Sequence, residues 1–200
     1  MQDSPVADFS SSMPMTVRRG DVFLSAQSTG PVWRVLKGAF RVDCQTESGE
    51  RLVHLALTGD WVGVEALCEE PYAYSVTALV DSEVQCEAMV DLPPIETMAA
   101  VLRQQQRQML ETVPLRSGSV VSCLTHLLGL LARCCNAEMA SLTRKDMPRL
   151  KQTAQLIDTA VETVCREMGR LLPDWVTRAP VALKLDVFSQ AFSCPAKVDA

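Results

Sequence analysis

Two charged residues near the C-terminal end of the chain are of types that read bases in DNA. Glu162 and Arg166 stand four residues apart in "TAVETVCREMGRL" (159–171), so on a helix they share one face. An arginine can donate two hydrogen bonds to guanine, and a carboxylate can accept one from the amino group of cytosine. The same two side chains could instead form a solvent-exposed i,i+4 ion pair, and this stretch alone leaves both interpretations open.

The local pattern predicts a helix that would hold this pair in place. Thr159, followed three residues later by Glu162, predicts a capping box at the start of the helix. The opposite face is apolar and is predicted to pack inward: Val161, Val164, Met168 and Leu171. A short helix over 149–156 and a tight turn precede it, which together predict a helix-turn-helix. Two β-like runs within 173–192 fit a two-stranded wing.

Upstream of these helices, the segment 21–89 is typical of β-structure. Short runs rich in Val, Leu and aromatic residues alternate with Gly, Pro, Asp and Ser, which predicts a sandwich or barrel. From Pro93 onward, apolar residues recur near helical spacing, interrupted by three glutamines at 104–106. Pro114 and the following "RSGS" are predicted to end this helix early, which makes it short. The run 120–135 is apolar around most of its circumference and is predicted to be a buried helix.

The charge balance differs between the two halves of the chain. Residues 1–91 carry 14 acidic and 6 basic side chains, a balance of −8, whereas residues 92–200 carry 10 acidic and 13 basic, a balance of +3. Such asymmetry predicts two domains with different partners. There is no long apolar run that would span a membrane, and the polar N-terminal stretch lacks the pattern of a secretory signal. We therefore expect a cytoplasmic protein that has no membrane partner.

The cysteines and histidines do not predict a metal site. Eight cysteines and two histidines are present without any C-x-x-C pair, so we expect reduced thiols, each a small buried hydrophobic residue, and no bound metal. The chain also lacks a P-loop, a G-x-G-x-x-G loop, an H-E-x-x-H motif and a nucleophile–His–Asp arrangement. We therefore expect a protein that is not an enzyme.

The order of elements and two motifs resemble a known family. The motifs are "GDWVGVEAL" (59–67), followed by "YSVTALVDSEV" (74–84), and "QLIDTAVETVCREMGRL" (155–171). Over roughly 17–192 the chain resembles the bacterial Crp/Fnr transcription regulators, and the acid at Glu65 makes it more similar to the Fnr/FixK-like branch. The resemblance implies an α+β fold with an N-terminal β-roll, a central dimerisation helix and a C-terminal winged helix-turn-helix. It divides the chain into a disordered lead-in (1–16), a sensor roll (17–92), the dimerisation helix (93–116) and a DNA-binding domain (117–200).

The resemblance also implies partners and site residues. The protein would be a homodimeric transcription factor that binds a near-palindromic double-stranded DNA site and contacts RNA polymerase. By position, the expected DNA contacts are Lys151, Glu162, Thr163, Cys165, Arg166 and Arg170. The expected effector pocket contains Gly59, Gly63, Val64, Glu65, Tyr72, Tyr74 and Ser75.

Departures from the family pattern change the expected ligand. Val64 stands where the cyclic-nucleotide branch has a glutamate, and the loop "ALCEEPYAYS" (66–75) contains no lysine or arginine. We therefore expect no cyclic AMP. The first cysteine, Cys44, lies already within the roll, so an iron–sulfur cluster is not expected. His54 and His126 are the two candidate haem ligands, so haem binding stays an open alternative.

Two further departures lie on the expected reading helix. Val161 stands where the cyclic-AMP branch has an arginine. Cys165 either permits close approach to DNA as a small residue or acts as an oxidation-sensitive thiol. Together with the net acidity and the short pairing helix, Val161 keeps an alternative open: a sensor or interaction protein that retained the fold without binding DNA.

Overall fold

The computed structural model describes residues 13–47, 49–87, 94–135, 142 and 146–171. The chain divides into two compact units, and the boundary falls inside a helix between Thr112 and Val113. The expected wing and most of the expected lead-in lie outside the described residues. Among the helices described, none combines the length and apolar character that a membrane span requires.

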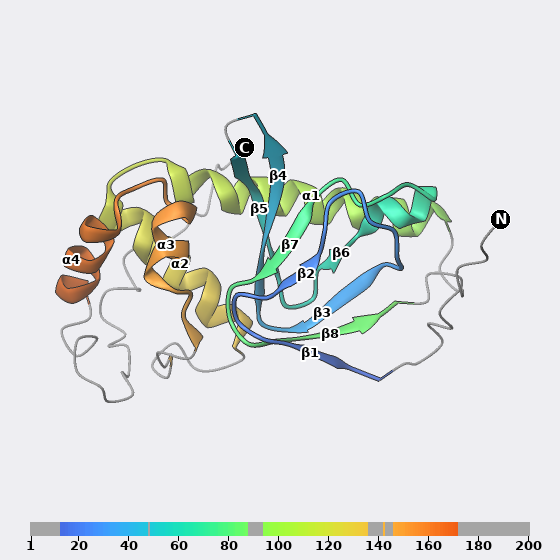
Figure 1. Cartoon of the computed structure of the whole chain (residues 1–200), viewed down its shortest axis with the longest axis horizontal. Helices are drawn as coiled ribbons and strands as arrows, with labels where there is room; N and C mark the ends of the chain where they lie inside the picture. Colours follow the sequence, from blue (N-terminus) through green and yellow to red (C-terminus); the bar gives the residue numbers. More distant parts are fainter. Residues whose placement is uncertain (1–12, 48, 88–93, 136–141, 143–145, 172–200) are drawn as a thin grey trace, which may run out of the picture. The chain divides into compact units, whose positions relative to one another are not determined.

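The first unit is a roll of two four-stranded antiparallel sheets (Figure 1). In order across the first sheet lie β1 (Met15–Val17), β8 (Ser82–Cys86), β3 (Trp33–Lys37) and β6 (Trp61–Val62). In order across the second lie β2 (Val22–Leu24), β7 (Ser75–Ala78), β4 (Ala39–Thr46) and β5 (Gly49–Leu57). The β-rich prediction for 21–89 is confirmed, although the first strand begins six residues earlier, at Met15.

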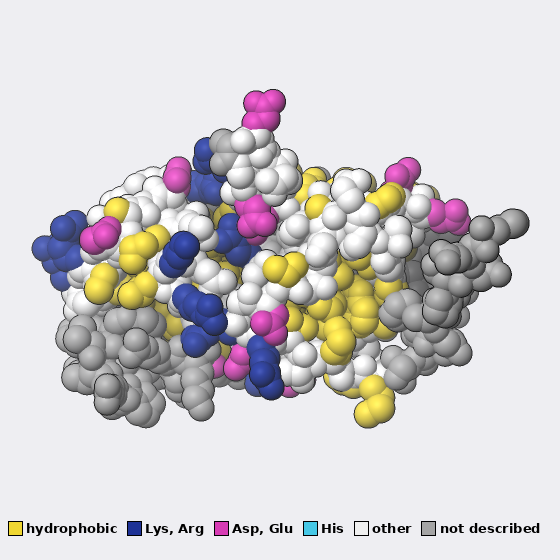
Figure 2. Space-filling view, viewed as in Figure 1, with side chains coloured by type: hydrophobic (Ala, Val, Ile, Leu, Met, Phe, Trp, Pro, Cys, Tyr) yellow, Lys and Arg dark blue, Asp and Glu magenta, His cyan; other side chains and the backbone are white. Residues whose placement is uncertain are grey.

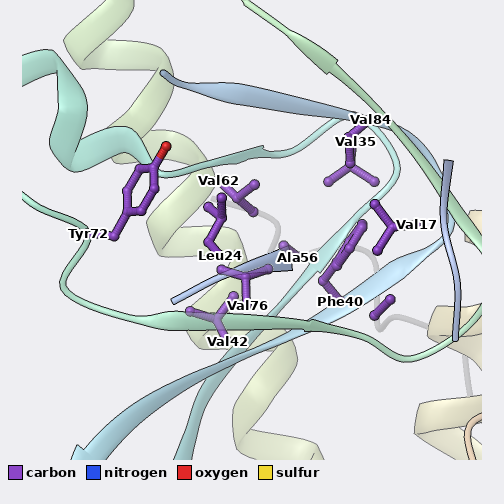
Figure 3. Packing of buried hydrophobic residues seen from close by; sticks show 11 residues of the cluster. Val17, Leu24, Val35, Phe40, Val42, Ala56, Val62, Tyr72, Val76 and Val84 are labelled. Atoms are coloured by element: carbon purple, nitrogen blue, oxygen red, sulfur yellow. The ribbon is translucent and has the colours of Figure 1, made fainter. Parts of the chain in front are cut away.

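Alternation along the strands builds the core of the roll. On β4, Phe40 and Val42 belong to the buried cluster between the sheets, while Arg41 and Asp43 lie on the opposite face. Figure 3 shows Phe40 beside Val17 and below Val35. Arg41 and Asp43 form a buried bidentate ion pair, with both nitrogen–oxygen distances 2.6 Å. The period-two pattern therefore separates an apolar inner face from a paired polar outer face.

A glycine explains why one long apolar run becomes two strands. The run "VWRVLKGAFRVDC" is split into β3 and β4 at Gly38, whose φ is +101°. This region of backbone conformation is disfavoured for residues with a Cβ atom. A Cβ at this position would also lie 2.9 Å from the Cα of Ser82. A side chain at Gly38 would therefore displace the neighbouring backbone.

The helix that follows the roll does not end at the proline that the sequence pattern marks as its end. Helix α1 (Pro94–Arg116) has 23 residues, about 34 Å at 1.5 Å per residue, and it continues through Pro114. The prediction that Pro114 ends the helix is wrong. In the last turn, the missing amide of Pro114 removes a single helical hydrogen bond, to Leu110, and there is little helix beyond it to disrupt. The chain breaks instead at Gly118, whose φ is +107°.

The faces of α1 are inverted relative to an ordinary surface helix. The polar side chains of Gln104 and Gln108 are buried, with exposed fractions of 9% and 2%. Six apolar side chains on the other side are exposed by 56% to 79%: Ile95, Met98, Leu102, Met109, Leu110 and Val113. A helix that exposes its apolar stripe needs a further partner to cover that stripe.

In the described part of the second unit lie three further helices: α2 (Val120–Cys134), α3 (Leu150–Leu156) and α4 (Val161–Leu171). The prediction that α2 is buried is confirmed, since ten of its fifteen residues are buried. Ser119 caps its start, because its hydroxyl accepts a hydrogen bond from the Ser122 amide at 3.1 Å. Helix α4 packs on both α2 and α3, and its fully buried side chains are Val164 and Met168.

The start of α4 differs from the prediction by one residue. The amides of Thr163 and Val164 both donate to the carbonyl of Ala160, so Ala160 and not Thr159 holds the N-cap position. The reason is the preceding turn, where Asp158 takes a left-handed conformation with φ of +50°. The turn therefore uses one more residue than the capping-box pattern assumes. Val161, expected inside, is consequently 38% exposed.

The cysteines are less uniformly buried than predicted. Of the seven described cysteines, Cys123 and Cys134 are buried, Cys68 and Cys165 are exposed, and the rest are half-buried. All seven are free thiols. The prediction that each is a buried small hydrophobic residue is therefore wrong for most of them. Periodicity could not find this, because several lie at strand ends or on exposed helix faces.

Candidate functional site

The first candidate site is a cavity of about 800 Å³ within the first unit. Strands β4 to β7, the loop around them and one face of α1 supply its walls. The roll contributes Leu24, Val42, His54, Trp61, Val62, Gly63, Val64, Glu65, Leu67, Cys68, Tyr72, Ala73, Tyr74 and Val76. Helix α1 contributes Thr97, Met98, Val101, Leu102, Gln104, Gln105 and Gln108. The volume and the mainly apolar lining are typical of small-molecule sites.

Five of the seven residues expected in the effector pocket line this cavity: Gly63, Val64, Glu65, Tyr72 and Tyr74. Two lie elsewhere. Gly59 forms the turn between β5 and β6 with φ of +93°. The hydroxyl of Ser75 accepts a hydrogen bond from the Ala26 amide at 3.1 Å, which joins β7 to the loop after β2. These two residues shape the surrounding backbone.

A glycine and a tyrosine fix one wall of the cavity. Gly63 has φ of +72°, and a Cβ there would lie 2.5 Å from a carbon of the Tyr72 ring. The Tyr72 hydroxyl donates a hydrogen bond to the carbonyl of Pro31 at 2.7 Å. Burial raises the pKa of Tyr72, which keeps this donor protonated. Figure 3 shows its ring beside Leu24 and Val62, at the edge of the core.

His54 is the titratable group of the cavity with the largest perturbation. Burial lowers the pKa of its imidazole to about 4, so the ring is neutral at physiological pH. Its ring meets Tyr74 edge-on, with the centroids 6.4 Å apart. His126, the second histidine, is half-buried on α2. Within the described residues, no three His, Cys, Asp or Glu side chains gather in a set that could hold a metal ion.

The lowered pKa of His54 predicts acid sensitivity of the roll. Between pH 6.5 and 4 the unfolded chain binds a proton at His54 that the folded chain does not, so stability falls as the pH falls through this window. We expect His54→Phe, which cannot titrate, to remove about 2–3 kcal/mol of this loss. Urea unfolding followed by tryptophan fluorescence at pH 7 and pH 4 measures it. Equal pH dependence in the two proteins would contradict a neutral buried imidazole.

Helix α1 is attached to the roll by its buried glutamines. The Trp61 amide donates to Gln104 Oε1, and Gln104 Nε2 donates to the Trp61 carbonyl, both at 2.8 Å. Strand β6 is the edge of its sheet, so the Gln104 amide group occupies the place of a neighbouring strand. Trp61 also lines the cavity. Residue spacing does not reveal this contact, because in the sequence the glutamines only interrupt an apolar stripe.

A buried carboxylate reinforces the attachment. Asp60 is 1% exposed and accepts hydrogen bonds from the Leu57 amide at 2.9 Å and from Gln108 Nε2 at 3.1 Å. It also forms an ion pair with Arg107. Burial raises the pKa of Asp60, while the Leu57 amide, Gln108 and Arg107 each oppose this shift. Arg107 and Gln108, which are neighbours on α1, therefore hold the helix against the turn that leads into the cavity.

Asp60 can be tested as the main polar anchor of α1. We expect Asp60→Ala to lower the free energy of unfolding by about 2–3 kcal/mol, because it leaves the Leu57 amide and the Gln108 amide without a partner. Asp60→Asn keeps one acceptor oxygen and should cost about half as much. Urea titration measures both. If Asp60→Ala is as stable as the wild type, the anchor carries no net stabilisation.

The second candidate site is the exposed face of α4. Lys151, Glu162, Cys165, Arg166 and Arg170 are exposed, and Thr163 is half-buried. Basic side chains gather at the end of the second unit that carries α4 (dark blue, left in Figure 2). The structure therefore presents most of the side chains expected to contact DNA to solvent.

Arg166 has an ion-pair partner other than the one suggested by i,i+4 spacing. Its Nε donates to Glu167 Oε1 at 3.2 Å, and Arg170 Nη1 reaches the same oxygen at 2.9 Å. Hydrogen bonding from Arg166, then from Arg170, lowers the pKa of the Glu167 carboxyl. The Arg166 side chain is still 60% exposed. Glu167, whose role no sequence motif indicates, thus orients two arginines on one surface.

Comparisons with known proteins agree with this architecture. Residues 14–86 match the model of the cyclic nucleotide-binding domain. A transcriptional regulator of the CRP family from Thermus thermophilus is 19% identical, with a TM-score of 0.62 over 88% of this chain and 95% of that one. FixK2 from Bradyrhizobium japonicum is 17% identical, with a TM-score of 0.64 over 92% and 98%. No curated protein sequence matches the chain.

These matches define the class of the protein at the level of fold. Residues 14–86 of the first unit are similar to a cyclic nucleotide-binding domain, and the described part of the chain has an α+β fold like that of the CRP/FNR regulators. No lysine or arginine is among the described residues that line the cavity. The side chain in the wall that carries a charge is the carboxylate of Glu65.

Proposed function

We propose that this protein is a homodimeric, sequence-specific DNA-binding transcription regulator of the Crp/Fnr type. The observation that carries the proposal is the surface of α4. Val164 and Met168 fix one face on α2 and α3, so Glu162, Cys165 and Arg166 are presented outward together. A helix of this kind fits the major groove, where arginine reads guanine and a carboxylate reads cytosine. Helices α3 and α4 with their short turn would then be the helix-turn-helix.

Dimerisation is supported by α1. Ile95, Leu102 and Met109 recur at seven-residue intervals and are exposed by 79%, 56% and 69%. A repeat of seven is the spacing of a coiled-coil seam, and from Ile95 to Val113 the stripe extends about 27 Å. The opposite side of the helix packs on the roll through the buried glutamines Gln104 and Gln108, so it is not available to a second copy. The occupant that fits such a stripe is the same stripe of a second copy.

Several finer features belong to the same proposal. The acid at Glu65 and the "VETVCR" stretch favour a regulator similar to the Fnr/FixK-like branch. Lys151, Thr163 and Arg170 would contact the DNA backbone around the base readers. RNA polymerase would be the further partner, and the protein would carry out no catalysis. The possible oxidation of Cys165, whose thiol is exposed, stays a prediction.

Selection of bound duplexes from a random-sequence library tests the proposal. The full chain should enrich an inverted repeat whose half-site centres lie about one helical turn apart, roughly 34–36 Å. Its affinity should fall steeply with salt, as phosphate contacts require. A library that shows no enrichment would favour the alternative, a sensor or interaction protein that retains the fold without reading DNA.

A further inference from the structure

The charge of the roll cavity opposes an anionic ligand. Glu65 lies in its wall, and Glu69 and Glu70 are exposed in the adjoining loop. No basic side chain from the described residues faces the interior to balance these carboxylates. Unlike charges in a partly desolvated site attract strongly and like charges repel strongly, so a phosphate placed here would be disfavoured.

The interior of the cavity is apolar and already shaped. Leu24, Val42, Val62 and Val76 belong both to the core of the roll and to the cavity wall. Figure 3 shows these four side chains clustered beside the ring of Tyr72. Because they are fixed by packing on the opposite side, they form a preformed apolar surface of the kind that small ligands bury.

Two neutral polar groups interrupt this apolar surface. The ring nitrogens of His54 and the hydroxyl of Tyr74 make no hydrogen bond to other residues that the structure describes, and the two rings contact each other edge-on. Burial keeps the pKa of His54 at about 4, so its imidazole offers one donor and one acceptor without a charge. A bound molecule with its own donor or acceptor would satisfy them.

We propose that the roll cavity binds an uncharged, mainly apolar small molecule that carries at least one hydrogen-bonding group, and that it does not bind a cyclic nucleotide. The inference adds a ligand site to the proposed regulator and rests on that proposed function for its regulatory meaning. The site itself rests on four observations: the cavity volume, the apolar wall, the acidic rim and the unpartnered neutral pair His54 and Tyr74.

A matched pair of fluorescent probes tests the ligand class directly. N-phenyl-1-naphthylamine and 8-anilino-1-naphthalenesulfonate share one aromatic skeleton, and the second carries a sulfonate. Titrated into the full chain, the neutral probe should saturate a single site per chain and bind at least about tenfold more tightly than the anionic probe. Cyclic AMP in large excess should not displace it. Tighter binding of the sulfonate, displacement by cyclic AMP or no saturable binding would overturn the proposal.

Substitutions on α1 test whether the probe binds in the cavity. Val101→Trp fills the cavity from α1 and should reduce affinity for the neutral probe at least about tenfold. Arg103→Trp, exposed on the same helix but outside both the cavity lining and the apolar stripe, is the matched control and should bind as the wild type does. Equal affinity of wild type and Val101→Trp would locate the probe elsewhere and overturn the proposal.

A second substitution keeps the test decisive if Val101→Trp fails to fold. Val64→Arg adds a cation to the wall beside Glu65 and should bring the anionic probe to at least the affinity of the neutral one. An unchanged preference would overturn the proposal. Probe binding is measured without DNA, so its failure is separable from failure of the proposed function. If the chain binds the neutral probe but no DNA, the proposed ligand site stands and the proposed function as a DNA-binding regulator fails.

Discussion

Arg166→Ala is expected to abolish most of the sequence-specific binding to a selected DNA site. The loss of one arginine that reads guanine costs about 1–3 kcal/mol, and a homodimer loses it in both half-sites, so the total is about 2–6 kcal/mol. The base preference at the corresponding position should relax at the same time. Fluorescence anisotropy with the selected duplex measures the affinity, and a repeated selection measures the preference.

Two matched variants separate base reading from the loss of a charge. Arg166→Lys keeps the positive charge but cannot donate a planar pair of hydrogen bonds, so it should retain binding to unrelated DNA and lose the base preference. Arg116→Ala removes a charge from the exposed end of α1 and should leave the preference intact. Affinity and preference that survive Arg166→Ala unchanged would show that α4 does not read DNA through this residue.

Met109→Lys is expected to separate the dimer into single chains. Met109 is 69% exposed on α1 and lies outside the cavity lining, so the change leaves the first unit intact. Across a seam of two copies it would bury two like charges in an apolar interface, which we expect to raise the dimer dissociation constant at least about 100-fold. Sedimentation equilibrium measures the change.

Glu96→Lys provides the control for Met109→Lys, because Glu96 is exposed on the same helix about 100° around the axis from the centre of the apolar stripe. It should stay dimeric. DNA affinity should fall with dimerisation in Met109→Lys and not in Glu96→Lys. A wild-type chain that sediments as a monomer at micromolar concentration, or a Met109→Lys protein that remains dimeric, would show that the stripe is covered in another way.

Local pattern in the sequence accounts for much of the fold. Alternation and turn residues located the strands of the roll, and the apolar circumference of 120–135 predicted the buried helix α2. The errors arise where geometry depends on distant or detailed contacts. Pro114 is tolerated because it lies in the final turn of α1, and Asp158 lengthens the turn before α4 by adopting a left-handed conformation. Neither effect is visible in residue spacing.

The candidate sites were only partly predictable for the same reason. Five expected pocket residues line the cavity because they lie on one continuous stretch after β6. Residues brought in from afar were missed, above all Gln104 and Gln108, which reach Trp61 and Asp60 across more than forty positions. In sequence they interrupt an apolar stripe, but in the structure they are the face that holds the helix to the roll. Glu167 was missed because its role depends on the orientation of two arginine side chains.

The dependence of affinity on half-site spacing tests the central claim most directly. If two copies of α4, held by α1, enter successive major grooves, inserting about five base pairs between the half-sites rotates them to opposite sides of the duplex. Anisotropy titrations should then show affinity lowered at least about tenfold, whereas inserting a full turn of about ten base pairs should restore part of it. Equal affinity for all three duplexes would contradict a dimer that reads two half-sites together.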